Sequence, residues 1–307
     1  MRLLRQGTGD NATQRIAVLG TFDGVHRGHR FLLDFMKNEA SFRNLESTVI
    51  TFEQHPLSII KPQALPPQLT TCAERIAHLG DSGVECCIML EFNEAFRQLS
   101  AQDFLKMIHH DYNVKMLVVG FDTRFGKDCV DGFEQYVEIG KAVGIEVVQA
   151  PEYGEGVSSS AIRQSLLSNN IVAANEALGY NYSISGKVVE GKQLGRTIGF
   201  PTANIEVADA TKLIPSNGVY AADVVIPHLG NEKHRAMLNI GRRPTVDVAN
   251  APLSIEVHVI DFEGDLYGKE LQVEFLQFLR HERPFSSLDA LIAQLQLDRQ
   301  QATSINS

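Results

Sequence analysis

The sequence predicts an α/β domain followed by an all-β domain, with a helix at the end of the chain. Its 307 residues are enough for about two domains of roughly 150 residues each. In the first half, short apolar runs alternate with helix-like segments, whereas after Tyr180 strand-like segments rich in β-branched residues follow one another. The alternating pattern is typical of a parallel sheet covered on both faces, and the consecutive strands indicate an antiparallel sandwich or barrel.

The elements of the first half follow from their apolar runs and periodicity. Ligands of a parallel sheet bind outside the carboxyl ends of its strands, so the segment after each strand is the first place to search for a site. The expected strands are 16–19, 48–52, 87–90, 116–119 and 146–149, and the expected helices are 28–37, 72–79, 101–109, 133–143, 159–167 and 172–178.

In the second half, Gly, Pro and Asn turns divide the expected strands 183–189, 218–226, 235–240, 254–262 and 271–279. The segment 287–297 is amphipathic, because its leucine and isoleucine residues recur on one helical face, and it predicts a closing helix. We expect the two domains to be 1–181 and 182–307.

Composition excludes several classes of function. The 28 Lys+Arg and 37 Asp+Glu residues give a net charge of −9, so a basic nucleic-acid-binding or anionic-membrane-binding surface is not expected. No apolar run approaches the roughly 18 residues of a membrane span, and no signal peptide is recognisable, which predicts a cytoplasmic protein. The four cysteines lack C-x-x-C spacing and are expected to be unpaired thiols. The sequence does not determine the oligomeric state.

The first motif is Gly20-Thr-Phe-Asp-Gly-Val-His-Arg-Gly-His29. It follows a strand and begins a helix, where backbone N–H groups and the helix dipole favour an anion. Gly24 and Gly28 allow the backbone to approach a phosphate closely, and His26 and His29, three residues apart, can donate hydrogen bonds to it. The glycine spacing does not match G-x-G-x-x-G. The alternatives are a metal-binding histidine pair or two surface histidines on a tight turn.

This segment resembles the H-x-G-H signature of the nucleotidylyltransferase superfamily, in the G-x-F-D-G-x-H-x-G-H form of the bifunctional bacterial riboflavin kinase/FMN adenylyltransferase family. Ser158-Ser-Ser-Ala-Ile-Arg163 is similar to the second superfamily motif, S-S-T-x-I-R. The resemblance implies that both motifs hold the phosphates of ATP, with His26 and His29 as transition-state stabilisers. The ATP-binding residues that it implies in this half are Gly20, Phe22, Gly24, Ser159, Ser160 and Arg163.

A third segment, Val119-Gly-Phe-Asp-Thr-Arg-Phe-Gly-Lys127, resembles the family's G-x-[DN]-F-x-F-G loop. By this resemblance Asp122 and Phe125 seat the flavin of FMN, and the alternative is a turn with one buried aromatic side chain. The chain departs from the family pattern at Thr123, where an aromatic residue is usual, and at Cys129, where arginine is frequent.

The second half carries Gly191-Lys-Gln-Leu-Gly-Arg-Thr-Ile-Gly-Phe-Pro-Thr-Ala-Asn204. Its composition alone favours a glycine-rich hairpin followed by a strand, although Thr202 and Asn204 offer hard oxygen donors that suit Mg²⁺. The run G-R-x-x-G-F-P-T-A-N is similar to the riboflavin kinase signature. That resemblance implies that Thr202 and Asn204 bind Mg²⁺ and the ATP phosphates, together with Gly191 and Arg196.

Phosphorylation of an alcohol needs an acceptor for the hydroxyl proton. In the expected strand 254–262, Glu256 and His258 alternate with apolar residues and point to the opposite face. A glutamate there is ordinarily only solvated, but the strand resembles the kinase family's E-x-H-x-x-D-F segment, whose glutamate is the proposed base. The resemblance also implies that Arg280 and Phe285 border the flavin.

Together these motifs imply a Rossmann-like nucleotidylyltransferase domain and a small antiparallel β-barrel kinase domain. The second domain would convert riboflavin and ATP to FMN, and the first would adenylylate FMN to FAD with release of pyrophosphate. Both steps would use Mg²⁺, with riboflavin, FMN and ATP as the binding partners. The alternative is a monofunctional riboflavin kinase with a degenerate first domain, which Thr123 and Cys129 favour and the intact His26, His29 and Arg163 oppose.

Overall fold

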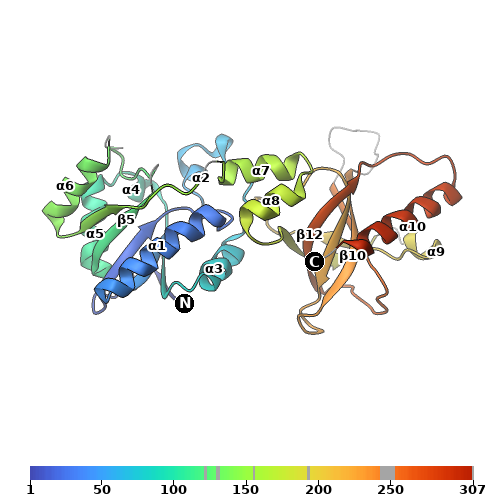
Figure 1. The fold of residues 1–307 in the computed structure, drawn as a ribbon, viewed down its shortest axis with the longest axis horizontal. Coiled ribbons are helices and arrows are strands. Elements are labelled where there is room, and N and C mark those ends of the chain that lie inside the picture. Colours follow the sequence, from blue (N-terminus) through green and yellow to red (C-terminus); the bar gives the residue numbers. More distant parts are fainter. Residues whose placement is uncertain (121–122, 129–131, 155, 192–193, 243–252, 306–307) are drawn as a thin grey trace. The chain divides into compact units, whose positions relative to one another are not determined.

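The computed structural model describes residues 1–305 apart from 121–122, 129–131, 155, 192–193 and 243–252. Asp122 and Cys129 therefore lie outside the described residues. The chain divides into two compact units, Met1–Ser159 and Ser160–Ser307 (Figure 1). None of the helices in the described part of the chain is long and apolar enough to cross a membrane.

The first unit is a six-stranded sheet in the order β1-β4-β3-β2-β5-β6, with every neighbouring pair parallel. The predicted α/β class is thus confirmed. The strands are β1 (Arg2–Arg5), β2 (Arg15–Leu19), β3 (Glu46–Phe52), β4 (Cys86–Leu90), β5 (Val114–Val119) and β6 (Glu146–Gln149); the helices are α1 (Arg27–Arg43), α2 (Leu57–Ile60), α3 (Cys72–Asp81), α4 (Glu94–Arg97), α5 (Ala101–Tyr112) and α6 (Phe133–Val143), with a 3₁₀ turn at Pro62–Ala64.

Helices cover both faces of this sheet (Figure 1). Along β2, Ile16 and Val18 belong to the core shared with α1 and α3, whereas Ala17 and Leu19 belong to the core shared with α5 and α6. Because successive strand side chains point to opposite faces, the apolar residues that follow Arg15 in this strand contribute to both cores, and the whole strand is buried. Since helices cover both faces of the sheet, we expect a ligand of the first unit to bind at the carboxyl ends of the strands.

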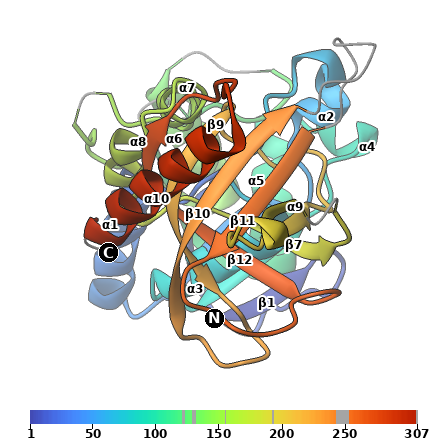
Figure 2. The same cartoon turned by 90° about the vertical axis from the view of Figure 1, so that its right-hand side faces the viewer.

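The second unit is built on a closed barrel in the order β10-β11-β8-β7-β12-β9, whose neighbours are antiparallel. The predicted barrel is confirmed. Helix α10 lies outside it, against β9, β10 and β12 (Figure 2). The strands are β7 (Ser183–Val189), β8 (Ala203–Glu206), β9 (Gly218–Val225), β10 (Lys233–Arg242), β11 (Leu253–Val259) and β12 (Glu270–Arg280); the helices are α7 (Ser159–Leu167), α8 (Ile171–Leu178), α9 (Leu194–Thr197) and α10 (Leu288–Ser304).

Helices α7 and α8 group with the barrel, whereas the sequence suggested a boundary at residues 181/182. Hydrogen bonds account for this grouping. The side-chain amide of Asn175 donates to the Phe275 carbonyl of β12 at 2.8 Å and accepts from the Tyr182 N–H at 2.8 Å. Ser216 Oγ also donates to the Leu167 carbonyl at 2.6 Å. These bonds join the segment before the barrel to the barrel itself.

The described cysteines are free thiols, as predicted. Cys86 and Cys87 are buried in β4 and Cys72 is partly buried. Burial, followed by the neighbouring Cys86, raises the pKa of Cys87 to about 12. A thiol with so high a pKa carries almost no thiolate at neutral pH, and thiolate is the reactive form. Cys87 is therefore a small apolar core residue.

Candidate active sites

In the first unit, His26 and His29 lie together at the start of α1. His26 is the N-cap residue, and its Nδ1 accepts a hydrogen bond from the His29 N–H at 3.3 Å. The two imidazole rings stack with centroids 3.6 Å apart. Because Nδ1 of His26 is an acceptor, we assign the ring proton to Nε2. The predicted pair is thus brought together at a helix N-terminus.

His29 is held in its neutral form. Burial, followed by the proximity of His26, lowers the pKa of His29 well below its usual range, and the ring of Phe22 meets the His29 ring edge to face with centroids 5.2 Å apart. A neutral imidazole carries one N–H group, which can donate a hydrogen bond to a phosphoryl oxygen. The pair therefore suits transition-state stabilisation through hydrogen bonds.

The loop before α1 is fixed by Asp23, a residue to which the sequence analysis gave no role. Its carboxylate accepts hydrogen bonds from the backbone N–H groups of Leu69 and Thr70, each at 3.0 Å. The hydroxyl of Thr70 in turn accepts from the Gly24 N–H at 3.0 Å. Ser159 Oγ donates to the Asp23 carbonyl at 3.0 Å. This network joins the loop to segments that are distant in sequence.

Backbone conformation also marks this loop as a functional element. Phe22 and Val25 are buried non-glycine residues with φ angles of 51° and 35°, a conformation that costs roughly 1–3 kcal/mol each and persists only where surrounding contacts impose it. Gly28 packs closely against His26, because a Cβ at this position would lie 3.2 Å from the His26 ring and would displace it. The sequence carries no signal for a positive φ angle at Phe22 or Val25, so this backbone strain was not predictable.

An aromatic cavity of about 640 Å³ opens at the carboxyl ends of the strands. Phe125 lines it and packs against Tyr136 with ring centroids 4.3 Å apart. The Tyr136 hydroxyl both accepts from the Phe125 N–H and donates to the Phe125 carbonyl, at 3.0 Å each, so the loop after β5 is held in place. Gly20 lines the same cavity. Ser160 and Arg163 lie on α7 in the second unit.

In the second unit, strand β11 separates two cavities. Glu256 and His258 line a larger cavity of about 280 Å³, whereas Val257 and Val259 line a smaller one of about 70 Å³. This division follows from the alternation of side chains along a strand, so the predicted faces of the segment are confirmed. Thr202 lines both cavities.

Glu256 lies in a row of polar residues across three strands. In the barrel register it is opposite Asn204 on β8 and Asn239 on β10, and residues directly opposite each other point to the same face. Ser254 Oγ donates to Glu256 Oε1 at 3.0 Å and orients the carboxylate. The barrel thereby brings together Glu256 and Asn204, which are 52 positions apart in the numbering.

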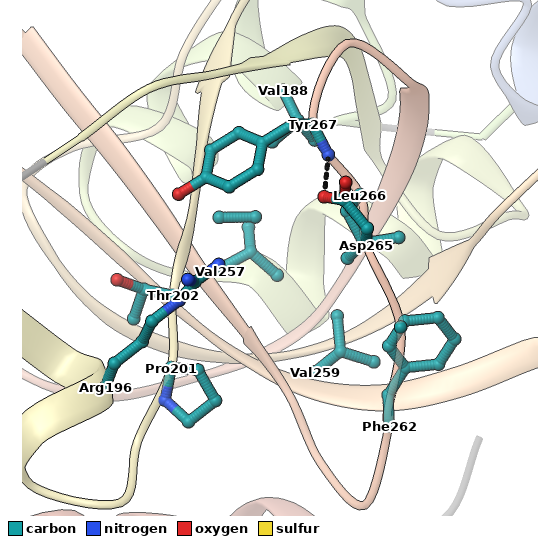
Figure 3. A pocket seen from close by; sticks show the side chains of 12 residues that line it. Val188, Arg196, Pro201, Thr202, Val257, Val259, Phe262, Asp265, Leu266 and Tyr267 are labelled. Atoms are coloured by element: carbon teal, nitrogen blue, oxygen red, sulfur yellow. Dashed lines mark hydrogen bonds between the residues drawn. The ribbon is translucent and has the colours of Figure 1, made fainter. Parts of the chain in front are cut away.

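The smaller cavity is closed by Tyr267 and by the segment that carries Arg196 (Figure 3). The guanidinium of Arg196 lies 5.6 Å from the Tyr267 ring centroid, and the Tyr267 N–H donates to Asp265 at 3.0 Å. Gly191 approaches Asn204 so closely that a Cβ would lie 2.1 Å from the amide nitrogen. Of the predicted phosphate-binding residues of this half, Arg196 and Thr202 thus line the smaller cavity, and Gly191 lies against Asn204.

Arg280 and Phe285, the two residues expected to border the flavin, both line the larger cavity. The guanidinium of Arg280 is engaged by Asp298 of α10, with Nε and Nη2 donating to the carboxylate at 3.0 and 2.8 Å. Its carbon Cζ lies 5.7 Å from the Phe285 ring centroid. Arg280 thus ties α10 to the cavity wall. Several residues that line this cavity received no role from the sequence, among them Phe200, Met237, Asn239, His258, Glu282, Leu291 and Leu295.

Comparison with known protein families supports the assignment of the two units. A family model described as FAD synthetase matches residues 9–162, and one described as riboflavin kinase matches residues 178–306. The chain is 39% identical over 288 residues to the Escherichia coli K12 bifunctional riboflavin kinase/FMN adenylyltransferase, covering 92% of this chain and 90% of that protein. The chain belongs to the bifunctional riboflavin kinase/FMN adenylyltransferase family.

Other members of this family match over similar lengths. The Bacillus subtilis protein of that description is 33% identical over 298 residues, with 95% of this chain and 93% of the relative covered. A crystal structure of a Streptococcus pneumoniae protein described as a macrolide-efflux protein superposes with a TM-score of 0.88 at 32% identity, and the match covers 100% of both chains. The fold of this chain is therefore shared with that protein over the whole length of both.

Proposed function

We propose that this chain phosphorylates riboflavin to FMN in its second unit and adenylylates FMN to FAD in its first. The observation that carries the kinase half is the position of Thr202 on both cavities of the barrel, with Glu256 in the larger one and Arg196 in the smaller. Two adjoining cavities that share a hydroxyl suit a phosphate donor and an alcohol acceptor that must meet. Family models for both activities match the chain, so the monofunctional alternative is not favoured.

In the kinase reaction, the isoalloxazine of riboflavin would occupy the larger cavity, whose walls include Phe200, Met237 and Phe285. The terminal hydroxyl oxygen of the ribityl chain attacks the γ-phosphorus of ATP, its proton passes to Glu256, and ADP leaves. Ser254 supports this role because its hydroxyl fixes the Glu256 carboxylate.

The phosphates of ATP would lie at the smaller cavity, within reach of Arg196 and the Thr202 hydroxyl. Thr202 and Asn204 are oxygen donors of the kind that Mg²⁺ prefers, and Mg²⁺ bound to ATP needs only one or two protein ligands. Among the described residues there is no group of three His, Cys, Asp or Glu side chains that could hold a metal ion. Mg²⁺ bound there would neutralise charge on the phosphates.

In the adenylyl transfer, a phosphate oxygen of FMN attacks the α-phosphorus of ATP, and pyrophosphate leaves. This chemistry needs no protein nucleophile, so the protein positions the reactants and neutralises the charge that develops. We assign hydrogen-bond donation to His26 and His29 and phosphate contacts to Gly20, Phe22, Gly24 and Ser159. Ser160 and Arg163 stay proposed phosphate contacts on sequence grounds. The aromatic cavity with Phe125 would hold the flavin of FMN, and Asp122 stays a proposed flavin contact on sequence grounds.

A time course tests both halves. Purified protein is incubated with riboflavin, ATP and Mg²⁺, and the flavins are separated by chromatography. We expect FMN first and FAD after it, and no conversion when EDTA replaces Mg²⁺. FMN that accumulates without FAD, also when FMN is supplied directly, would refute adenylyl transfer. A lack of FMN would refute the kinase assignment.

A further inference from the structure

We propose that His258 is a positioning residue for phosphoryl transfer, which holds the Pro201–Thr202 peptide beside Glu256. This inference rests on the kinase function proposed above. His258 follows Glu256 by two residues on β11 and lines the same cavity. The two side chains therefore share one face of the strand, and the base and its neighbour are fixed by the same stretch of backbone.

The link to Thr202 is a hydrogen bond from the imidazole. Nδ1 of His258 lies 2.8 Å from the Pro201 carbonyl oxygen. A carbonyl oxygen can only accept, so Nδ1 carries the proton and donates. The acceptor belongs to the peptide plane that includes the nitrogen of Thr202, and this plane is rigid. The hydrogen bond to this oxygen therefore fixes the position and direction of the backbone just before Thr202 relative to β11.

The surroundings of His258 restrict it to this arrangement. Its side chain is 8% exposed, and its ring meets Phe200 edge to face with centroids 5.3 Å apart. Burial is the main cause that lowers the pKa of His258, so the ring is neutral at neutral pH and adds no positive charge beside the phosphates. Gly195 lets the same segment fold back, because a Cβ there would lie 2.1 Å from the Phe200 carbonyl oxygen.

If His258 positions the Pro201–Thr202 peptide, its replacement should lower the rate of FMN formation more than it lowers folding stability. Loss of one neutral hydrogen bond costs about 0.5–1.5 kcal/mol of folding stability. A displacement of about 1 Å between reacting groups lowers the rate roughly 100-fold. A histidine that served only the fold would show the reverse proportion, with a lower melting temperature and an unchanged turnover of the folded enzyme.

The experiment compares three variants of the full chain. His258→Phe retains an aromatic ring against Phe200 but has no donor. His258→Asn places an amide nitrogen near the position of Nδ1 and restores the donor. His234→Phe is the matched control, because His234 lies on neighbouring β10 and also meets an aromatic ring, Phe262, edge to face at 5.4 Å, but does not line the cavity.

For each variant, kcat for FMN formation, the Kd of riboflavin from quenching of flavin fluorescence, and the melting temperature are measured. We expect His258→Phe to lower kcat about 10- to 100-fold while the riboflavin Kd changes by less than about threefold. His258→Asn should recover kcat to within about fivefold of the unsubstituted protein. FAD formation from supplied FMN and the His234→Phe variant should be unaffected.

Two results would overturn the assignment of His258 alone: an unchanged kcat in His258→Phe, or an equal loss in His258→Phe and His258→Asn. An effect confined to the riboflavin Kd would also overturn it, in favour of a direct flavin contact. If the unsubstituted protein forms no FMN, the kinase function itself fails and the inference fails with it.

Discussion

Replacement of Arg280 by methionine should destabilise the second unit, because it leaves the buried Asp298 carboxylate without its positively charged partner. Asp298 is 2% exposed and the Arg280 side chain 19% exposed at their ion pair. Removal of one member of a buried pair costs about 3–5 kcal/mol, and the partial exposure of Arg280 places the expected cost near 3 kcal/mol. For a unit of this size that corresponds to a drop of about 10 °C in melting temperature.

A double-mutant cycle gives the assay its internal control. Arg280→Met and Asp298→Leu together replace the pair by apolar side chains of similar volume, which is often neutral or stabilising. We expect calorimetry of the full chain to place the double variant within about 1 kcal/mol of the original protein. Melting temperatures that fall additively, or an unchanged Arg280→Met variant, would refute the reasoning. Riboflavin affinity of the stable double variant then reports whether Arg280 also contacts flavin.

Four further predictions concern the two reactions and pH. Glu256→Gln should lower FMN formation from riboflavin about 10²- to 10⁴-fold and leave FAD formation from supplied FMN unchanged, which chromatography of the flavins distinguishes. His29→Ala should do the reverse and stop the sequence at FMN; an unaltered FAD yield would contradict our assignment. Gly191→Ala should raise the KM for ATP, since its Cβ would lie 2.1 Å from the Asn204 amide, while the KM for riboflavin stays constant in steady-state assays. The pKa of His29 is lowered in the folded protein, so as the pH falls the unfolded chain takes up this proton first. The contribution of His29 to the free energy of unfolding should therefore be complete above about pH 6.5 and decrease below it. Urea unfolding at pH 7.5 and at pH 5.5 should give a smaller difference in the free energy of unfolding for His29→Asn than for the unsubstituted protein.

Contiguous motifs were predictable because their geometry is local. A glycine-rich turn before an amphipathic run is enough to place His26 and His29 at a helix N-terminus, and strand alternation is enough to put Glu256 and His258 on one face. The structure agrees on both points. The sequence also anticipated that Thr202 and Glu256 belong to one site, through the family resemblance.

Contacts between distant segments were not predictable from one sequence. Apolar periodicity shows which face of a segment is buried, but not which element covers it, so neither the Arg280–Asp298 pair nor the bonds of Asp23 to Leu69 and Thr70 could be inferred. The edge strand β1 was missed for a related reason. Its two arginines are exposed and its pairing with β4 is parallel, so neither alternation nor a turn signal marks it.

The closed barrel has a consequence for insertions and deletions. Every strand has two neighbours, so no strand can slip without breaking pairs on both sides, and a slip of one residue exchanges the two faces of a strand. Removal of one residue from β11 before Glu256 would turn the carboxylate toward the smaller cavity and Val257 toward the larger. We therefore expect changes of chain length to be tolerated in the turn that joins β9 to β10 and to be lethal to kinase activity within β8 or β11.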